Sequence, residues 1–122
     1  MGCEWRLEYV ARPQLLNSER SAHWRAHRAT TEEWRQAFRV LALEAKIPRC
    51  EQIEVTVIHE RKDRRSIPDV GACFPSVKAA VDGVTDAGVV DHDGPDHVVR
   101  LVFEAPVVTG RHALVLVVRE VD

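Results

Sequence analysis

Cysteine is scarce in this sequence of 122 residues. The three cysteines, Cys3, Cys50 and Cys73, lie far apart along the chain. A disulfide scaffold and a thiolate zinc site both need more cysteines at closer spacing, so neither is expected. We expect reduced thiols, and we expect Cys73 to lie in the core, because free cysteine is among the most frequently buried residue types.

Long apolar runs are missing as well. The run ALVLVV at residues 113–118 is far shorter than the roughly 20 residues of a membrane-spanning helix. The N-terminal stretch MGCEWRLEYV has no basic region followed by an apolar segment and a small-residue cleavage site, so no secretory signal is predicted. With 45% hydrophobic and 30% charged residues, the composition is typical of a soluble globular protein. We therefore expect a cytoplasmic protein with no membrane partner.

A strong net charge is also absent, but the charges are unevenly distributed. The formal charge of -2 argues against a uniformly basic surface that coats nucleic acid. Residues 20–39 nevertheless carry five arginines, and residues 61–65 read RKDRR. Residues 82–97 hold five aspartates and no lysine or arginine. Because crowded like charges repel one another, this acidic segment is expected to attract a cation.

Periodicity predicts alternating strands and helices. Apolar runs between turn residues are typical of strands, and apolar residues at spacings of three and four are typical of helices. The strands are expected at residues 3–10, 52–60, 97–105 and 112–121, and the helices at about 21–45 and 75–87. The predicted fold is one compact α/β (α+β) domain over residues 1–122, in the order strand, helix, strand, helix, strand, strand, with a mixed sheet packed against both helices.

Apolar stripes define the side of each predicted helix that faces the core. In the first helix the stripe consists of Trp34, Phe38, Leu41, Ala42 and Ala45. In the second helix it consists of Val77, Ala80, Val81 and Val84. Gly88 follows the second helix, at the position where a left-handed C-terminal cap is expected.

Acidic and basic side chains gather around the second predicted helix. Lys78 and Asp82 are four residues apart, so they share one face of the helix, off the apolar stripe. Asp69 precedes this helix, and Asp91 and Asp93 follow it. Carboxylates suit Mg²⁺ or Mn²⁺, which proteins usually hold with one or two carboxylates, water and substrate phosphate. The pattern predicts a metal-dependent phosphodiesterase in which Lys78 stabilises charge in the transition state.

The same residues also have ordinary structural interpretations. Aspartates near glycine and proline often serve turns and helix caps. Lys78 and Asp82 have the spacing of a surface ion pair, and His92 and His97 lack the spacing of a zinc motif. A charge run such as RKDRR is usually a solvated loop. Composition and spacing therefore leave both interpretations open.

The stretch RRSIPDVGACFPSVKAAVDGVTDAGVVDHDGPDHV, residues 64–98, resembles the core signature of the RusA-type Holliday junction resolvases, which are often phage-encoded. That signature has basic residues, Asp-x-Asp-Asn, Lys-Ala-x-x-Asp-Gly/Ala-Leu, x-x-Ala-Gly and then paired aspartates. The residues that fall in step are Lys78, Ala79, Asp82, Gly83, Ala87 and Gly88. Upstream, LLNSERSAHWRAHR resembles the family's N-terminal segment, so the resemblance spans most of the chain.

The resemblance implies a homodimeric, Mg²⁺-dependent endonuclease that binds four-way or otherwise branched DNA. Such an enzyme cuts two opposed strands during recombination or repair. Asp69, Lys78, Asp82 and Asp93 match the family's catalytic positions. The resemblance assigns metal binding to the aspartates and phosphate contact to the lysine.

The chain departs from the family pattern at several positions. Gly71 and Ala72 stand where the signature has its second aspartate and its asparagine, and His92 stands for the first of the paired aspartates. Asp91 or His92 can replace the missing ligand. A histidine ligand would favour Mn²⁺ over Mg²⁺, because imidazole is softer than carboxylate. The expected metal ligands are therefore Asp69, Asp82, Asp91 and Asp93.

Basic side chains near both predicted helices are expected to contact DNA. They are Arg20, Arg25, Arg28, Arg61, Lys62, Arg64, Arg65 and Lys78. Such groups contact phosphates rather than bases, so binding should be selective for structure and sensitive to salt. Two alternatives remain: an inactive DNA-binding protein on the same fold, and a dimeric structural or inhibitory protein whose acidic loop contacts a partner.

Overall fold

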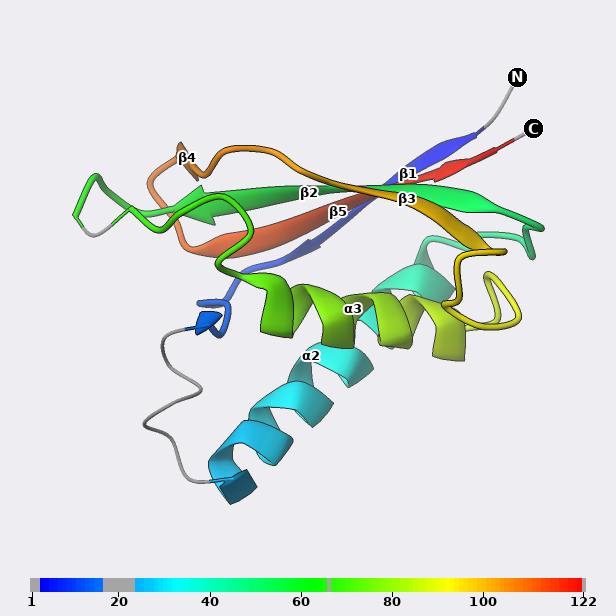
Figure 1. The fold of residues 1–122 in the computed structure, drawn as a ribbon, viewed down its shortest axis with the longest axis horizontal. Coiled ribbons are helices and arrows are strands. Elements are labelled where there is room, and N and C mark those ends of the chain that lie inside the picture. Colours follow the sequence, from blue (N-terminus) through cyan, green and yellow to red (C-terminus); the bar gives the residue numbers. More distant parts are fainter. Residues whose placement is uncertain (1–2, 17–23, 66, 122) are drawn as a thin grey trace.

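The computed structural model describes residues 3–16, 24–65 and 67–121, with only the backbone described for residues 24–27. In these ranges a mixed five-stranded sheet packs against two helices in a single α+β domain, as predicted (Figure 1). The elements are β1 (Glu4–Tyr9), α2 (Trp24–Glu44), β2 (Ile53–Arg61), α3 (Phe74–Asp86), β3 (Val98–Phe103), β4 (Val107–Val108) and β5 (Ala113–Glu120). No helix in these ranges is long and apolar enough to cross a membrane.

The sheet has the strand order β1-β5-β2-β3, and β4 pairs with the end of β2. β5 is antiparallel to both of its neighbours, whereas β2 is parallel to β3 and β4. The two long C-terminal strands therefore do not pair with each other, because β2 lies between them. Parallel neighbours need a long connection, and α3 supplies it between β2 and β3. The short strand β4 is an addition to the predicted elements.

Both helices cover the same face of the sheet (Figure 1). The stripe predicted for the first helix is confirmed, since Trp34 and Phe38 are 1% and 0% exposed. Tyr9 of β1 packs edge-on against Trp34, with ring centroids 4.9 Å apart. Cys73 is buried as predicted, and burial raises the pKa of its thiol to about 11. Burial of these large side chains is the main stabilising contribution to the domain.

Two glycines place α3 in the fold. A Cβ atom added at Gly83 would lie 2.1 Å from the carbonyl oxygen of Arg35, so the backbones of α2 and α3 pack almost in contact. Just after the C-terminal end of α3, Gly88 has a φ of +90° and donates its N–H to the carbonyl of Thr85 at 2.9 Å. This confirms the predicted left-handed end of the helix. The position of α3 determines where Lys78 and Asp82 project.

Candidate functional site

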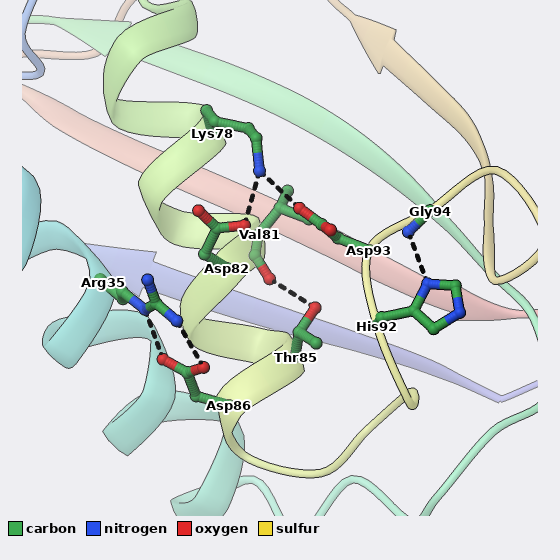
Figure 2. A network of polar contacts seen from close by, with 9 residues as sticks. All are labelled: Arg35, Lys78, Val81, Asp82, Thr85, Asp86, His92, Asp93 and Gly94. Carbon is green, nitrogen blue, oxygen red and sulfur yellow. Dashed lines mark hydrogen bonds and ion pairs between the residues drawn. The ribbon is translucent and has the colours of Figure 1, made fainter.

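Lys78, Asp82 and Asp93 lie together on the exposed side of α3 (Figure 2). Lys78 and Asp82 are one turn apart on the helix, and Asp93 lies in the loop that leads to β3. Lys78 Nζ donates to Asp82 Oδ1 at 2.7 Å and to Asp93 Oδ2 at 2.5 Å. One ammonium group therefore joins two carboxylates. We call these three residues the lysine–aspartate cluster.

Contact within the cluster separates the pKa values of the two aspartates. A hydrogen bond from Asp82, followed by one from Lys78, lowers the pKa of Asp93 to about 2. Burial, followed by the hydrogen bond with Asp93, raises the pKa of Asp82, whose side chain is 25% exposed. Burial lowers the pKa of Lys78, but its bonds to both aspartates outweigh this and raise the pKa above its ordinary value. A proton on this pair therefore resides on Asp82, while Asp93 stays ionised.

The cluster opens onto two surface hollows that meet at Phe74 and Lys78. One hollow, of about 410 Å³, is lined by Leu16 and Asp82 among other residues. The other hollow, of about 310 Å³, is lined by Asp93 and the start of β3. Phe74 is 41% exposed and lines both hollows, yet nothing in the sequence pattern singled it out. A ligand can therefore reach Lys78 from either side of α3.

Asp69 lies outside the lysine–aspartate cluster. It lines a third hollow, of about 540 Å³, formed by residues 67–72 with Leu15 and Leu16. Its side chain is exposed and has no partner among the residues that the structure describes. Leu16 also lines the hollow that contains Asp82, so Asp69 lies farther along the same surface.

Asp91 and His92 are also directed elsewhere. Asp91 forms an ion pair with Arg49. His92 Nδ1 accepts the N–H of Gly94 at 3.1 Å, and its ring packs edge-on against His97. Figure 2 shows the ring of His92 pointing away from Lys78. Neither residue therefore takes the place of the missing aspartate in this structure.

The four expected metal ligands do not converge. Across the described ranges, no group of three or more His, Cys, Asp or Glu side chains is arranged to hold a metal ion. Of the expected ligands Asp69, Asp82, Asp91 and Asp93, the contacting pair is Asp82 and Asp93. A metal at this site would therefore have two protein carboxylates, which is a common number for Mg²⁺ when water and phosphate complete the coordination.

Arginines from distant parts of the chain pair with two aspartates of the acidic segment. Asp86 accepts two hydrogen bonds from Arg35 of α2, at 2.6 and 2.8 Å. Arg49 pairs with Asp91, and Lys78 pairs with Asp93 as described above. The arginine partners lie 51 and 42 residues away in the sequence, so local spacing cannot reveal these pairs. Arg35, Arg49 and Lys78 thus pair with four of the five aspartates of residues 82–97, namely Asp82, Asp86, Asp91 and Asp93.

The predicted DNA contacts fall into different environments. Lys62, Arg64 and Arg65 are exposed in the loop after β2, and Arg28 is exposed with Glu32 as its ion-pair partner. Arg61 is only 4% exposed, which differs from the expectation of an exposed DNA contact. The reason is that β2 extends through Arg61 and turns this side chain inward. Arg20 and the side chain of Arg25 lie outside the described residues.

A scan against protein-family models and a search of curated proteins both found no match to this chain. The resemblance of residues 64–98 to the RusA-type signature therefore remains a prediction.

Proposed function

We propose that this protein is a metal-dependent endonuclease of the RusA type that cuts branched DNA, including four-way junctions. The observation that carries the proposal is the contact of Lys78 with both Asp82 and Asp93 beside two open hollows. A phosphodiesterase needs carboxylates for a cation and a positive group for the phosphate, and the cluster contains both. The order of strands and helices is also the one that the resemblance implies.

Asp82 and Asp93 would hold Mg²⁺, or alternatively Mn²⁺. Two adjacent carboxylates repel each other unless a proton or a cation lies between them, and Lys78 provides that cation in this structure. A bound divalent ion would supply the neutralising charge and lower the pKa of a water molecule. Lys78 would then be released from the carboxylates and could donate to the phosphate of the DNA backbone.

The exposed loop after β2 supplies the proposed contact with the DNA backbone. Lys62, Arg64 and Arg65 carry positive charge there, and their side chains are exposed. Such residues attract phosphates without reading bases, so affinity should fall steeply with salt. In the proposed homodimer, two-fold symmetry would present two such loops and two clusters to opposed strands of a junction.

A second candidate is a DNA-binding protein on this fold that has lost cleavage activity. The observation that favours it is the separation of Asp69 and Asp91 from the lysine–aspartate cluster, together with the pairing of both remaining carboxylates by Lys78. In that case the cluster stabilises the end of α3 and the following loop, and binding of branched DNA persists without chemistry.

Cleavage of a labelled four-way junction tests the proposal. Wild type is compared with Asp93→Asn and with the matched control Asp96→Asn, which changes an exposed aspartate of the same loop. Each is assayed on junction and linear duplex with Mg²⁺, Mn²⁺ or EDTA. We expect paired nicks in the junction that need metal, retained by the control and reduced by about 100-fold or more in Asp93→Asn.

The other outcomes are equally informative. Tight junction binding without nicking in either metal supports the second candidate. Cleavage that persists in Asp93→Asn, or in EDTA, contradicts the assigned site. Failure of the wild-type protein to bind junction DNA above linear duplex would contradict both candidates.

A further inference from the structure

A second group of polar side chains lies at the far end of the sheet, where β2 ends and β5 begins. Glu60 and Ala113 are the last paired residues of these strands, so Arg61 and His112 come next in the same register. His59 precedes Arg61 by two residues on β2 and therefore shares its face of the sheet. That face also carries Val57 and is the one covered by the helices.

Four buried nitrogen atoms of these side chains have no hydrogen-bond partner among the described residues. His59 is 2% exposed, and neither of its ring nitrogens has a hydrogen-bond partner in the described part of the chain. Arg61 is 4% exposed, and its Nε is likewise unpaired there. His112 Nδ1 is a further buried nitrogen without a partner among the same residues. Native proteins almost always pair buried polar atoms, so this concentration of unpaired nitrogens needs an explanation.

The charge around these nitrogens is mainly positive. The charges of Arg12, Arg61 and Lys62 lower the pKa of His112, whereas the carboxylate of Asp63 raises it. Asp63 is itself engaged, because it accepts the backbone N–H of Arg65 at 2.9 Å. Burying an arginine without an opposite charge is costly. The charge of the described side chains around these nitrogens therefore suits an anionic ligand.

We propose that His59, Arg61 and His112 form a binding site for a tetrahedral oxyanion of the phosphate type. The guanidinium is a planar fork of donors that fits two oxygens of such an anion, and each imidazole offers an N–H donor. The anion has two possible sources: free inorganic phosphate, or a phosphodiester of the DNA backbone reached from the basic loop that follows Arg61. The second source rests on the proposed function, whereas the first does not.

Thermal unfolding of the full chain in phosphate, sulfate and chloride at equal ionic strength tests the site. In wild type the unfolding temperature should rise saturably with phosphate or sulfate but not with chloride, because a ligand that binds the folded state stabilises it. Arg61→Met removes the guanidinium while keeping apolar volume, and it should abolish this response. Arg100→Met, which removes an exposed arginine of β3 outside the proposed DNA contacts, is the matched control and should respond like wild type.

The unfolding temperature in chloride shows whether Arg61→Met is still folded. Because Arg61→Met removes a buried charge that has no ion-pair partner among the described residues, its unfolding temperature in chloride should equal or exceed that of wild type. His59→Phe should likewise lose the phosphate response while remaining folded. The proposal is overturned if Arg61→Met keeps the wild-type response to phosphate, or if wild type responds to phosphate no more than to chloride.

Binding of a fluorescent four-way junction then separates the two sources. If a phosphodiester occupies the site, Arg61→Met should weaken junction binding by at least about tenfold more than Arg100→Met, and inorganic phosphate should compete. If only free phosphate binds, the two variants should bind the junction equally while Arg61→Met still loses the thermal response. A wild-type protein that ignores the junction but responds to phosphate contradicts the proposed function and leaves the anion site intact.

Discussion

The helices α2 and α3 cross so closely at Gly83 that replacing this glycine by alanine should lower the stability of the fold. Helix propensity alone would predict a gain in stability. A Cβ atom at position 83 would lie 2.1 Å from the carbonyl oxygen of Arg35 and 2.9 Å from the backbone nitrogen of Arg39. Both are backbone atoms of α2, so no rotation of a side chain relieves the contact. Gly83→Ala should therefore force the two helices apart and destabilise the fold.

The magnitude follows from two opposed effects. Alanine is favoured over glycine in a helix interior by about 1 kcal/mol. Overpacking a close-packed interior costs about 1–3 kcal/mol, and a contact far inside the ~3.5 Å optimum belongs at the upper end of that range. The free energy of unfolding should therefore fall by about 1–2 kcal/mol. Because α3 carries Lys78 and Asp82, displacement of the helix should also reduce any activity of the cluster.

Urea unfolding, followed by the fluorescence of buried Trp34, measures this change. Gly83→Leu should lose more stability than Gly83→Ala, because a larger side chain increases the steric conflict. Gly110 is the control: its φ is +92° and an added Cβ meets nothing within 4 Å. There, alanine and leucine should cost similar amounts through backbone strain alone. A Gly83→Ala protein as stable as wild type, or more stable, would refute the close crossing of the helices.

Two further predictions concern the charged groups. Burial, then the charges of Arg61 and His112, lowers the pKa of His59 from 6.5 to about 4, so the unfolded chain binds the extra proton first as the pH falls. The free energy of unfolding of wild type should fall by up to about 3 kcal/mol between pH 6.5 and pH 4 through this histidine. Urea titrations over this pH range should show that His59→Phe lacks this loss. In Lys78→Met, the paired carboxylates of the cluster lose their resident cation, so millimolar Mg²⁺ should raise the unfolding temperature more than in wild type. If the unfolding temperature of the variant is the same in Mg²⁺ and in EDTA, metal binding by Asp82 and Asp93 is contradicted.

Local patterns predicted most of the fold because the elements are long and strongly periodic. The stripe through Trp34 and Phe38 and the cap at Gly88 depend on neighbours within a few residues, and both are confirmed. Strand neighbours depend instead on contacts between distant residues. The position of β2 between β3 and β5 therefore had no local signal, and neither did the two-residue strand β4.

At Arg61 two sequence patterns conflict, a charge run and a period-two alternation. The run RKDRR indicated a solvated loop that begins at Arg61. The alternation through Ile53, Val55 and Val57 continues, however, to His59 and Arg61, and all of these side chains are buried. Period-two alternation is imposed by strand geometry, whereas a charge run only describes composition. The alternation was the stronger physical argument, and it would have placed Arg61 inside.

In the lysine–aspartate cluster one lysine forms two ion pairs, and these pairs bear on the proposed function as well as on stability. In the absence of other ligands, Lys78 neutralises Asp82 and Asp93, so a divalent ion has to compete with a cation that is already in place. The competition becomes favourable when a phosphate is present to receive the released ammonium group. Binding of metal and binding of DNA should therefore support each other, and by linkage each increases the affinity for the other by the same factor. Under the proposed function, this coupling would restrict the assembled metal site to the complex with DNA.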